Sequence, residues 1–398
     1  MRRNDSWSIA VTGMACICAA GNTPEDALAA FFRGGRSLAD PSVISPRALP
    51  YPFFAVGEDS FPDGRRNSAL DTFVLAQQAA AKALALAALP DESLSRTALV
   101  LGTTSGSAMH FLDAYAACRT QDSPFGKADD RQREIDDYFT GNLALALPIA
   151  CGGPRLTVTD ACTSGADAIG LGMDLVASGQ CSCAICGGAD ALSLVPHTGF
   201  ARLTVYAPEP CRPFDRDRRG LNLGEAAAVM VLESRAHAEN RKAPILGHML
   251  GYGNAADACR FAAPHPEGRG LANAVAAALA QAGIDPGDVA FINAHGTATH
   301  ENDRIEGRLL SRMFPSAPIW ASKGGTGHTL GAAGALEAVL ALQALRSGHI
   351  PPSPGFLTVD PEIGLAPTRE ETPVRTPYAL STSLGFGGGN AALVLGRA

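Results

Sequence analysis

Short apolar runs rich in β-branched residues alternate with longer alanine-rich stretches along this chain. The short runs have the length of strands buried on both faces, and the long stretches have the length and residue preferences of helices. Strands are predicted at Ile9–Thr12, Ala98–Gly102, Leu156–Thr159, Cys183–Cys186, Ala227–Leu232, Val289–Asn293, Ile319–Ala321, Tyr378–Ser383 and Ala391–Leu395. Helices are predicted at Thr23–Arg33, Ala69–Leu89, Ala166–Ser178, Leu271–Gly283 and Gly334–Ser347. This alternation is typical of an α/β protein whose sheets are covered by helices.

The chain also contains a weak internal repeat. A shift of 169 residues places GADAIGLGMDLVASG, from Gly165, over GALEAVLALQALRSG, from Gly334, with five of fifteen positions identical. Matches among alanine and glycine residues arise easily by chance, so duplication and coincidence both remain open. Two similar α/β halves that face each other are the simplest architecture for such a repeat.

Composition excludes several broad classes of protein. Of the 398 residues, 46% are hydrophobic and 18% are charged, so the chain can bury at least one large core. Its formal net charge of −7 is opposite to that of most proteins that bind nucleic-acid phosphates, and nucleic acid is not expected as a partner. No run approaches the roughly 20 apolar residues of a membrane span, so no membrane association is expected.

The N-terminal segment could be a short signal peptide or the first buried strand. Arg2 and Arg3 precede the apolar run Ile9–Ala20, as in a signal peptide, but Thr12 and Gly13 interrupt that run. We therefore favour a buried strand. The 10 cysteines are too few for a disulfide scaffold and several lie within apolar runs, which predicts reduced cysteines in a cytoplasmic protein.

The first candidate for chemistry is Cys162, in LTVTDACTSGADAIG. It lies among small residues at a sharp turn between a strand that ends near Thr159 and a helix that starts near Ala166. The positive end of the helix dipole would favour a thiolate there, and backbone N–H groups at such a turn can hold an oxyanion. Taken alone, a small buried structural cysteine would be the commoner interpretation.

Two histidines follow other predicted strands. His295 lies in HGTATHEND directly after the strand Val289–Asn293, and His328 lies with Lys323 in ASKGGTGHTLGAAG before another helix. The carboxyl ends of strands are where α/β folds place their sites, so one cysteine and two histidines there predict a common site. Such a trio suits attack by a thiolate on an acyl donor, followed by stabilisation of a developing enolate through imidazole N–H groups. Lys323 could hold the local potential positive.

These motifs resemble those of the β-ketoacyl-acyl carrier protein synthases, the condensing enzymes of the thiolase superfamily. The resemblance runs over essentially the whole chain, through AVTG, DACTSG, CRPFDRDRRGLNLGE, NAHGTAT, KGGTGHTLGAAG and SLGFGGGNA. The order of the motifs is similar to that of the elongating subclass, which has one cysteine and two histidines.

The resemblance implies a role for each matching position. Cys162 matches the nucleophile that accepts the acyl chain, and His295 and His328 match the pair that supports malonyl decarboxylation and stabilises the enolate. Lys323 matches the lysine five residues before the second histidine, and Glu337 matches the supporting acid nine residues after it.

Further matches concern the access route and the gate. Thr297 and Thr299 match threonines that contact the phosphopantetheine arm, and Asp303 matches a structural acid in the same loop. Phe386 matches a mobile gate beside the nucleophile, and its backbone N–H would form the oxyanion hole together with that of Cys162.

The fold implied by the resemblance is the thiolase-like, five-layered αβαβα arrangement with two similar halves. Residues 1–245 would form the half that carries the cysteine, and residues 246–398 the half that carries both histidines. The implied reaction is a decarboxylative Claisen condensation of an acyl thioester with malonyl-acyl carrier protein, in fatty-acid or polyketide elongation. No metal or soluble cofactor is required, since the substrates are carried on the phosphopantetheine of the acyl carrier protein.

The resemblance leaves the assembly and two other functions open. The enzyme would act as a homodimer or as a heterodimer of ketosynthase and chain-length factor. A thiolase is one alternative, and the histidine pair argues against it. A non-catalytic chain-length factor is the other, and it is disfavoured because such partners typically lack the nucleophile found here as Cys162.

Departures from the usual family pattern concern substrate choice. RDGFVLGEGAG is replaced by RRGLNLGEAAA from Arg218, KSS or KSM is replaced by KGG from Lys323, and GFGGTN is replaced by GFGGGN. The GLNLGE motif is similar to the corresponding sequence of ketosynthases from aryl polyene and related type II polyketide clusters. Small residues such as Ser105 stand where the family lines its acyl pocket. The resulting hypothesis is a wide pocket for long or rigid unsaturated chains.

Two further clusters were considered. CRPFDRDRRG contains several arginines, for which solvated surface charge is the simpler interpretation and docking of an acidic carrier protein is the alternative. The residues assigned to this docking surface are Arg65, Arg66, Arg212 and Arg216. Cys181, Cys183 and Cys186 lie close in sequence, but no second group of histidines or cysteines follows at usable spacing, so no metal site is expected.

Overall fold

The structure is a computed structural model that describes residues 9–45, 48–62, 64, 66, 70–104, 106 and 143–398, and the backbone of residue 63. Ten strands form one sheet: β1 Ile9–Cys18, β2 Thr97–Gly102, β3 Arg155–Val158, β4 Cys183–Asp190, β5 Ala226–Ser234, β6 Gly247–Ala256, β7 Val289–Asn293, β8 Ile319–Trp320, β11 Tyr378–Leu384 and β12 Gly389–Arg397. The short strands β9 His349–Ile350 and β10 Thr372–Pro373 pair separately. The helices are α1 Pro24–Phe32, α2 Asp71–Ala87, α3 Asp91–Leu94, α6 Leu143–Ala146, α7 Ser164–Ala177, α8 Leu194–Arg202, α9 Arg235–Asn240, α10 Arg269–Ala282, α11 His300–Met313, α12 Lys323–Thr326 and α13 Ala333–Ser347.

The strand order repeats within the sheet. The first half runs β3-β2-β4-β5-β1, and the second half runs β8-β7-β11-β12-β6, so each strand has a counterpart at the same place. The pairing directions agree as well, because β2 and β7 are parallel to both neighbours whereas β5 and β12 are antiparallel to both. The halves join where β1 pairs with β6. The predicted pair of similar halves is therefore confirmed, while the division between residues 245 and 246 stays a prediction.

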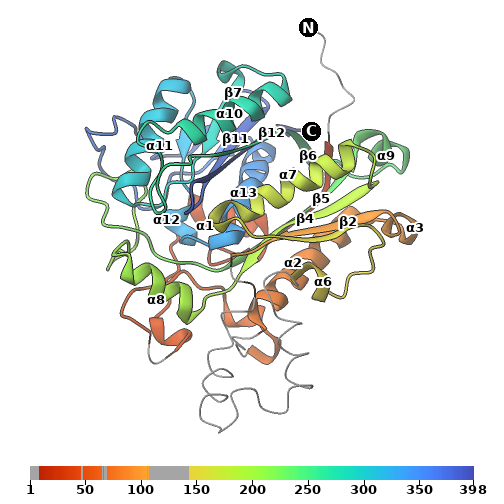
Figure 1. The fold of residues 1–398 in the computed structure, drawn as a ribbon, viewed down its shortest axis with the longest axis horizontal. Helices are drawn as coiled ribbons and strands as arrows, with labels where there is room; N and C mark the ends of the chain where they lie inside the picture. Colours follow the sequence, from red (N-terminus) through yellow and green to blue (C-terminus); the bar gives the residue numbers. More distant parts are fainter. Residues whose placement is uncertain (1–8, 46–47, 65, 67–69, 105, 107–142) are drawn as a thin grey trace.

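Helices alternate with the two half-sheets in five layers (Figure 1). Helix α2 covers the outer face of the first half, α10 covers that of the second, and α7 and α13 pack against each other between them. These two central helices are the segments that carry the weak internal repeat. Helix α13 is buried along almost its whole length, which explains its alanine- and leucine-rich sequence. The predicted αβαβα architecture is confirmed.

Most predicted elements are found within a few residues of their expected bounds, and β7 at Val289–Asn293 matches in full. Strand β6 was missed because Gly251 and Gly253 interrupt its apolar pattern. A Cβ at either glycine would lie about 2 Å from a backbone oxygen of α10, so close packing rather than strand propensity selects glycine there. Helix α11 was missed because its sequence is rich in charge, although two of its acids, Asp303 and Glu306, are buried.

No helix among the described residues is both long enough and apolar enough to span a membrane.

Candidate active site

Cys162 lies at a tight turn between β3 and α7. Ala161 has a φ of 45°, in the left-handed region that residues with a Cβ rarely adopt, and Ala161–Thr163 form a 3-10 turn that leads into α7. The turn brings the Cys162 side chain, which is 5% exposed, to the base of a cavity. The predicted strand-to-helix turn is therefore present.

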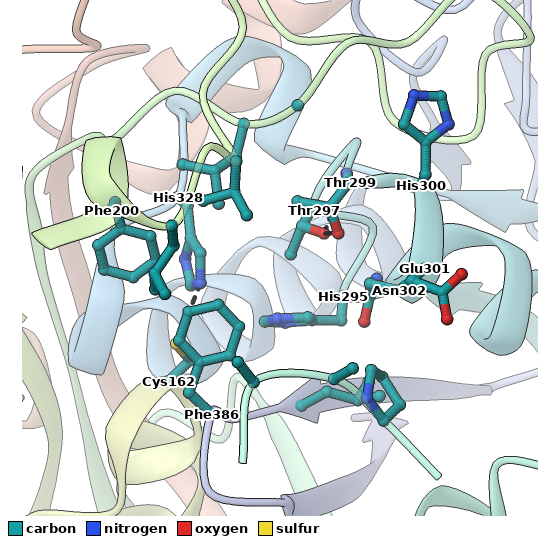
Figure 2. A pocket seen from close by; sticks show the side chains of 18 of the residues that line it. Cys162, Phe200, His295, Thr297, Thr299, His300, Glu301, Asn302, His328 and Phe386 are labelled. Carbon is teal, nitrogen blue, oxygen red and sulfur yellow. Dashed lines mark hydrogen bonds between the residues drawn. The ribbon is translucent and has the colours of Figure 1, made fainter. Parts of the chain in front are cut away.

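The Cys162 thiol contacts one base. Its Sγ lies 3.1 Å from Nε2 of His328, and the backbone N–H of Phe386 also donates to it (Figure 2). Burial raises the pKa of Cys162 to about 12, although Lys323 and the Phe386 N–H act to lower it. Burial therefore opposes the expected preference for a thiolate at the helix N-terminus, and that preference stays a prediction.

His295 follows β7 and is fixed by Lys323. The Lys323 Nζ donates to three acceptors: His295 Nδ1 at 3.1 Å, the His295 carbonyl at 2.6 Å, and the Glu337 carboxylate. An ammonium group only donates, so Nδ1 of His295 must accept and the ring proton lies on Nε2. Burial and the Lys323 charge hold the pKa of His295 well below its usual value. The neutral ring therefore offers an Nε2–H donor on its other side.

The two imidazoles differ in their partners. The rings lie 5.2 Å apart and nearly perpendicular, and both point toward the space beside Cys162 (Figure 2). Burial, followed by the charge of Lys323, also holds the pKa of His328 well below its usual value. Because His328 contacts the thiol and His295 contacts the lysine, the first is placed to accept a proton and the second to donate a hydrogen bond.

Buried acids hold the loop that carries His295. Glu306, on α11, accepts hydrogen bonds from the backbone N–H groups of His295 at 2.8 Å and Gly296 at 2.9 Å. Asp303 accepts from Ala298 N at 3.1 Å, in agreement with a structural role, and burial raises the pKa of both carboxyls. Sequence reasoning missed Glu306. Its only signal was an acid placed one turn after Asp303, on the same helix face.

Burial raises the pKa of Glu337 to about 7, although the adjacent Lys323 lowers it. The contact between the two side chains is buried.

The cavity in front of these residues has a volume of about 280 Å³. Thr297 and Thr299 line it, with their hydroxyl oxygens 2.9 Å apart. Phe386 stacks on Phe200 with ring centroids 5.4 Å apart, and Phe200 also lies edge-on to His328 (Figure 2). Phe200, on α8, was missed because a single phenylalanine in a short helix carries no sequence signal of its own.

Other predicted residues are not brought to this site. Ser105 and Arg65 lie outside the described residues. The Arg66 guanidinium donates to the buried Glu225 carboxylate and to Val56 O, so it is an internal ion pair rather than a free surface charge. This contact corrects its assignment to a docking surface.

The other arginines of the cluster differ in their surroundings. Arg216 is exposed but pairs with the adjacent Asp217, and Arg212 is half-buried. Arg218 is buried and contacts Asp360 and Asp303, which removes it from the surface cluster.

One group of possible metal ligands occurs among the described residues, and it combines residues that the sequence did not connect. Cys183 Sγ lies 3.8 Å from His237 Nδ1, and that nitrogen lies 2.6 Å from Glu233 Oε2. The Glu233 carboxylate is already bound by Arg241 and by the Thr12 hydroxyl. This occupied carboxylate indicates a structural ion pair, and the other two cysteines of the sequence cluster do not take part.

Comparisons with known proteins agree with this geometry. The sequence models of the β-ketoacyl synthase N-terminal and C-terminal domains match residues 60–238 and 246–357. The chain is 34% identical to 3-oxoacyl-[acyl-carrier-protein] synthase 2 of Mycobacterium bovis, over 77% of this chain and 76% of that protein. It is 36% identical to the enzyme of the same name from Staphylococcus aureus, over 65% and 67% of the respective chains.

Solved structures show the same fold over the full length. The ishigamide ketosynthase/chain length factor superposes with a TM-score of 0.88 at 28% identity, covering 98% of this chain and 99% of the other. A ketosynthase from Xenorhabdus doucetiae, solved in complex with its chain length factor, superposes with a TM-score of 0.82 at 29% identity, with complete coverage of both chains.

Proposed function

Because the chain belongs to the β-ketoacyl synthase family of condensing acyltransferases, we propose that Cys162, His295 and His328 carry out its two half-reactions. The enzyme is a 3-oxoacyl-[acyl carrier protein] synthase that joins an acyl thioester to malonyl-acyl carrier protein. One observation supports the residue roles above all others. The Cys162 thiol, the His328 base and the fixed N–H donor of His295 meet at one cavity. Cys162 Sγ lies 3.1 Å from His328 Nε2.

The first half-reaction transfers the acyl chain to Cys162. The Sγ attacks the thioester carbonyl while His328 Nε2 accepts the thiol proton, and the proton then passes to the departing carrier thiolate. The backbone N–H groups of Phe386 and Cys162 stabilise the negative oxygen of the tetrahedral intermediate. The thiol, whose pKa is about 12, needs this nearby base because few molecules carry a thiolate at neutral pH.

The second half-reaction consumes the malonyl group. The His295 Nε2–H donates to the malonyl thioester carbonyl as the carbon–carbon bond to carbon dioxide breaks and the enolate forms. The enolate carbon attacks the acyl carbonyl on Cys162, which releases the sulfur as a thiolate and yields the 3-oxoacyl carrier. Lys323 and Glu337 keep the His295 proton on Nε2 throughout. Thr297 and Thr299 contact the phosphopantetheine arm at the cavity wall.

We infer that the acyl carrier protein is the substrate donor and that a second chain completes the assembly. Within the part of the chain that the structure describes, strand β3 forms one end of the sheet and has no partner on its outer edge, and its apolar Leu156 is 38% exposed. A homodimer or a heterodimer with a chain-length factor would cover it. The molar mass of the purified chain in solution distinguishes these, since a homodimer has twice the chain mass and a chain awaiting another partner stays monomeric.

Long or rigid unsaturated acyl groups remain the proposed substrates. Purified enzyme is incubated with carriers that bear short saturated, long saturated and polyenoyl chains, and the adduct on Cys162 is identified by mass spectrometry. Acylation of Cys162 followed by release of a 3-oxoacyl carrier on addition of malonyl carrier supports the function. Acylation by short saturated chains alone would refute the proposed substrate class.

A further inference from the structure

Two departures from the family sequence pattern meet at the catalytic loop that runs from Lys323 to His328. One is Asn222, in GLNLGE, and the other is the pair Gly324 and Gly325. They are far apart in sequence, yet the two glycines lie within this loop and Asn222 contacts its end at His328. Their shared position suggests that they support one structure.

The buried amide of Asn222 joins two backbone segments. Its Oδ1 accepts a hydrogen bond from Cys211 N at 2.7 Å, and its Nδ2 donates to Ala207 O at 3.0 Å. Asn222 is fully buried, so both contacts are made away from water. A valine, which the family pattern has at this place, could make neither contact.

The segment from Cys211 to Gly224 holds both ends of the catalytic loop. His328 N donates to Asn222 O at 2.8 Å, and His328 O accepts from Gly224 N at 3.0 Å. At the other end, Cys211 Sγ donates to Lys323 O at 3.3 Å. Since Cys211 N is itself bound to the Asn222 side chain, the amide connects the support of Lys323 to the support of His328.

The two glycines let neighbouring residues close on this loop from behind. A Cβ at Gly324 would lie 1.8 Å from Pro354 O, and a Cβ at Gly325 would lie 2.4 Å from the Phe31 ring. Arg36 donates to Gly324 O at 2.6 Å and also contacts the carbonyl of Cys211. The side chains of the usual KSS or KSM pattern would not fit, so glycine and Asn222 belong to the same local arrangement.

We propose that Asn222 is a positioning residue that sets the place of His328 Nε2 against the Cys162 thiol for acyl transfer, the first half-reaction. The proposal rests on the proposed function, because it assigns His328 a part in that reaction. Asn222 touches no substrate in this role and acts only through the backbone of residues 211 and 328. Loss of its amide would leave Cys211 N and Ala207 O unpaired and would let the loop shift.

The first test compares Asn222→Val with the wild type. We expect complete end-point acylation of Cys162, a single-turnover acylation rate lower by about tenfold to hundredfold, and a rate of reaction of the pre-acylated enzyme with malonyl carrier within about twofold of wild type. A purely structural role would instead lower the fraction of Cys162 that can be acylated and leave the acylation rate of the competent fraction unchanged. An unchanged acylation rate, or a loss explained by that fraction alone, would overturn the proposal.

The second test is Asn222→Asp, which keeps the shape of the side chain. A protonated carboxyl has one acceptor and one donor, as the amide has, and burial raises the pKa of such a group. The single-turnover acylation rate of this variant relative to wild type should rise at least about threefold as the pH is lowered from 8 to 6. A ratio that stays constant over this range would contradict the proposal even if Asn222→Val fails to fold.

Thr97→Val serves as the matched control. Thr97 is buried, its hydroxyl donates to Ser93 O at 2.8 Å, and it lies at the opposite end of β2 from the site. Its rates should match wild type. A wild-type enzyme whose Cys162 accepts no acyl group from a carrier would refute the proposed function and the positioning role together, whereas an Asn222→Val variant that is acylated at the wild-type rate refutes the positioning role alone.

Discussion

The two halves contain the same turn, and only one of them carries a nucleophile. Ala161, with a φ of 45°, opens the 3-10 turn Ala161–Thr163 before α7, and Leu330, with a φ of 55°, opens the 3-10 turn Leu330–Ala332 before α13. The shift of 169 residues found in the sequence relates these two positions. Cys162 in the first half therefore corresponds to Gly331 in the second.

The surroundings of the two turns explain the difference. Gly331 N donates to Asp190 Oδ2 at 2.7 Å, and a Cβ on Gly331 would lie 2.6 Å from Thr104 N, so this turn is packed closed against the first half. The turn of Cys162 faces the cavity. The second half contributes chemistry instead through the loops that precede its turn and follow β7, which carry His328 and His295. The duplicated framework thus supplies two equivalent places, and the loops make them different.

Removal of the nucleophile has the largest expected effect. Cys162→Ala should lower acylation and condensation by roughly 10⁴-fold or more, because no side chain at the corresponding Gly331 can replace it. Intact-protein mass spectrometry after incubation with an acyl carrier measures the adduct. An acylated Cys162→Ala protein would show that the nucleophile has been assigned to the wrong turn.

The two histidines should separate the half-reactions. His295→Ala should lower condensation by about 10²- to 10⁴-fold and leave acylation of Cys162 near wild type, because His295 contacts Lys323 rather than the thiol. His328→Ala should slow acylation as well, because its Nε2 is 3.1 Å from Sγ. Single-turnover acylation and steady-state condensation are measured for both variants. Equal acylation rates in the two variants would contradict the assignment of the thiol proton to His328 rather than to His295.

The residues of this comparison were not equally predictable. Cys162, His295 and His328 could be selected from sequence because each follows an apolar run at a strand's carboxyl end, in a motif with small residues. The main layers of the fold followed from the same alternation. It did not predict β6 and α11, whose patterns are set by glycine packing and by buried acids, or short helices such as α8. Glu306 and Phe200 could not be selected, because their contacts depend on how α8 and α11 meet the loops.

Electrostatic detail was the least predictable part. The turn before α7 suggested a thiolate, but the depth of burial of Cys162 is a property of the assembled halves and cannot be read from one motif. Arg66 was assigned to the surface for the same reason, since its partner Glu225 lies far away in sequence.

The pH dependence of alkylation tests whether burial or the helix N-terminus controls Cys162. Since burial raises its pKa to about 12, the thiolate fraction should increase about tenfold per pH unit from pH 7 to 10. The rate of Cys162 alkylation by iodoacetamide, followed by peptide mass spectrometry, should rise with that slope and show no plateau. The exposed Cys259 in the same sample is the internal control. A plateau below pH 8 for Cys162 would mean that the turn stabilises the thiolate after all.

The smallest expected effect concerns the closed turn. Gly331→Ala adds a single Cβ that would lie 2.6 Å from Thr104 N, with no flexible side chain to move aside, so the free energy of unfolding should fall by about 1–3 kcal/mol. Gly287→Ala is the matched control, because no atom lies within 4 Å of its added Cβ, and it should change stability by less than about 0.5 kcal/mol. Thermal unfolding of the two variants measures the difference. The turn that carries Cys162 belongs to the first half and faces the cavity. Cys162 should therefore still become completely acylated in the Gly331→Ala variant. Equal stability of Gly331→Ala and wild type would show that the second turn is as open as the first, and that the two halves differ in residue choice alone.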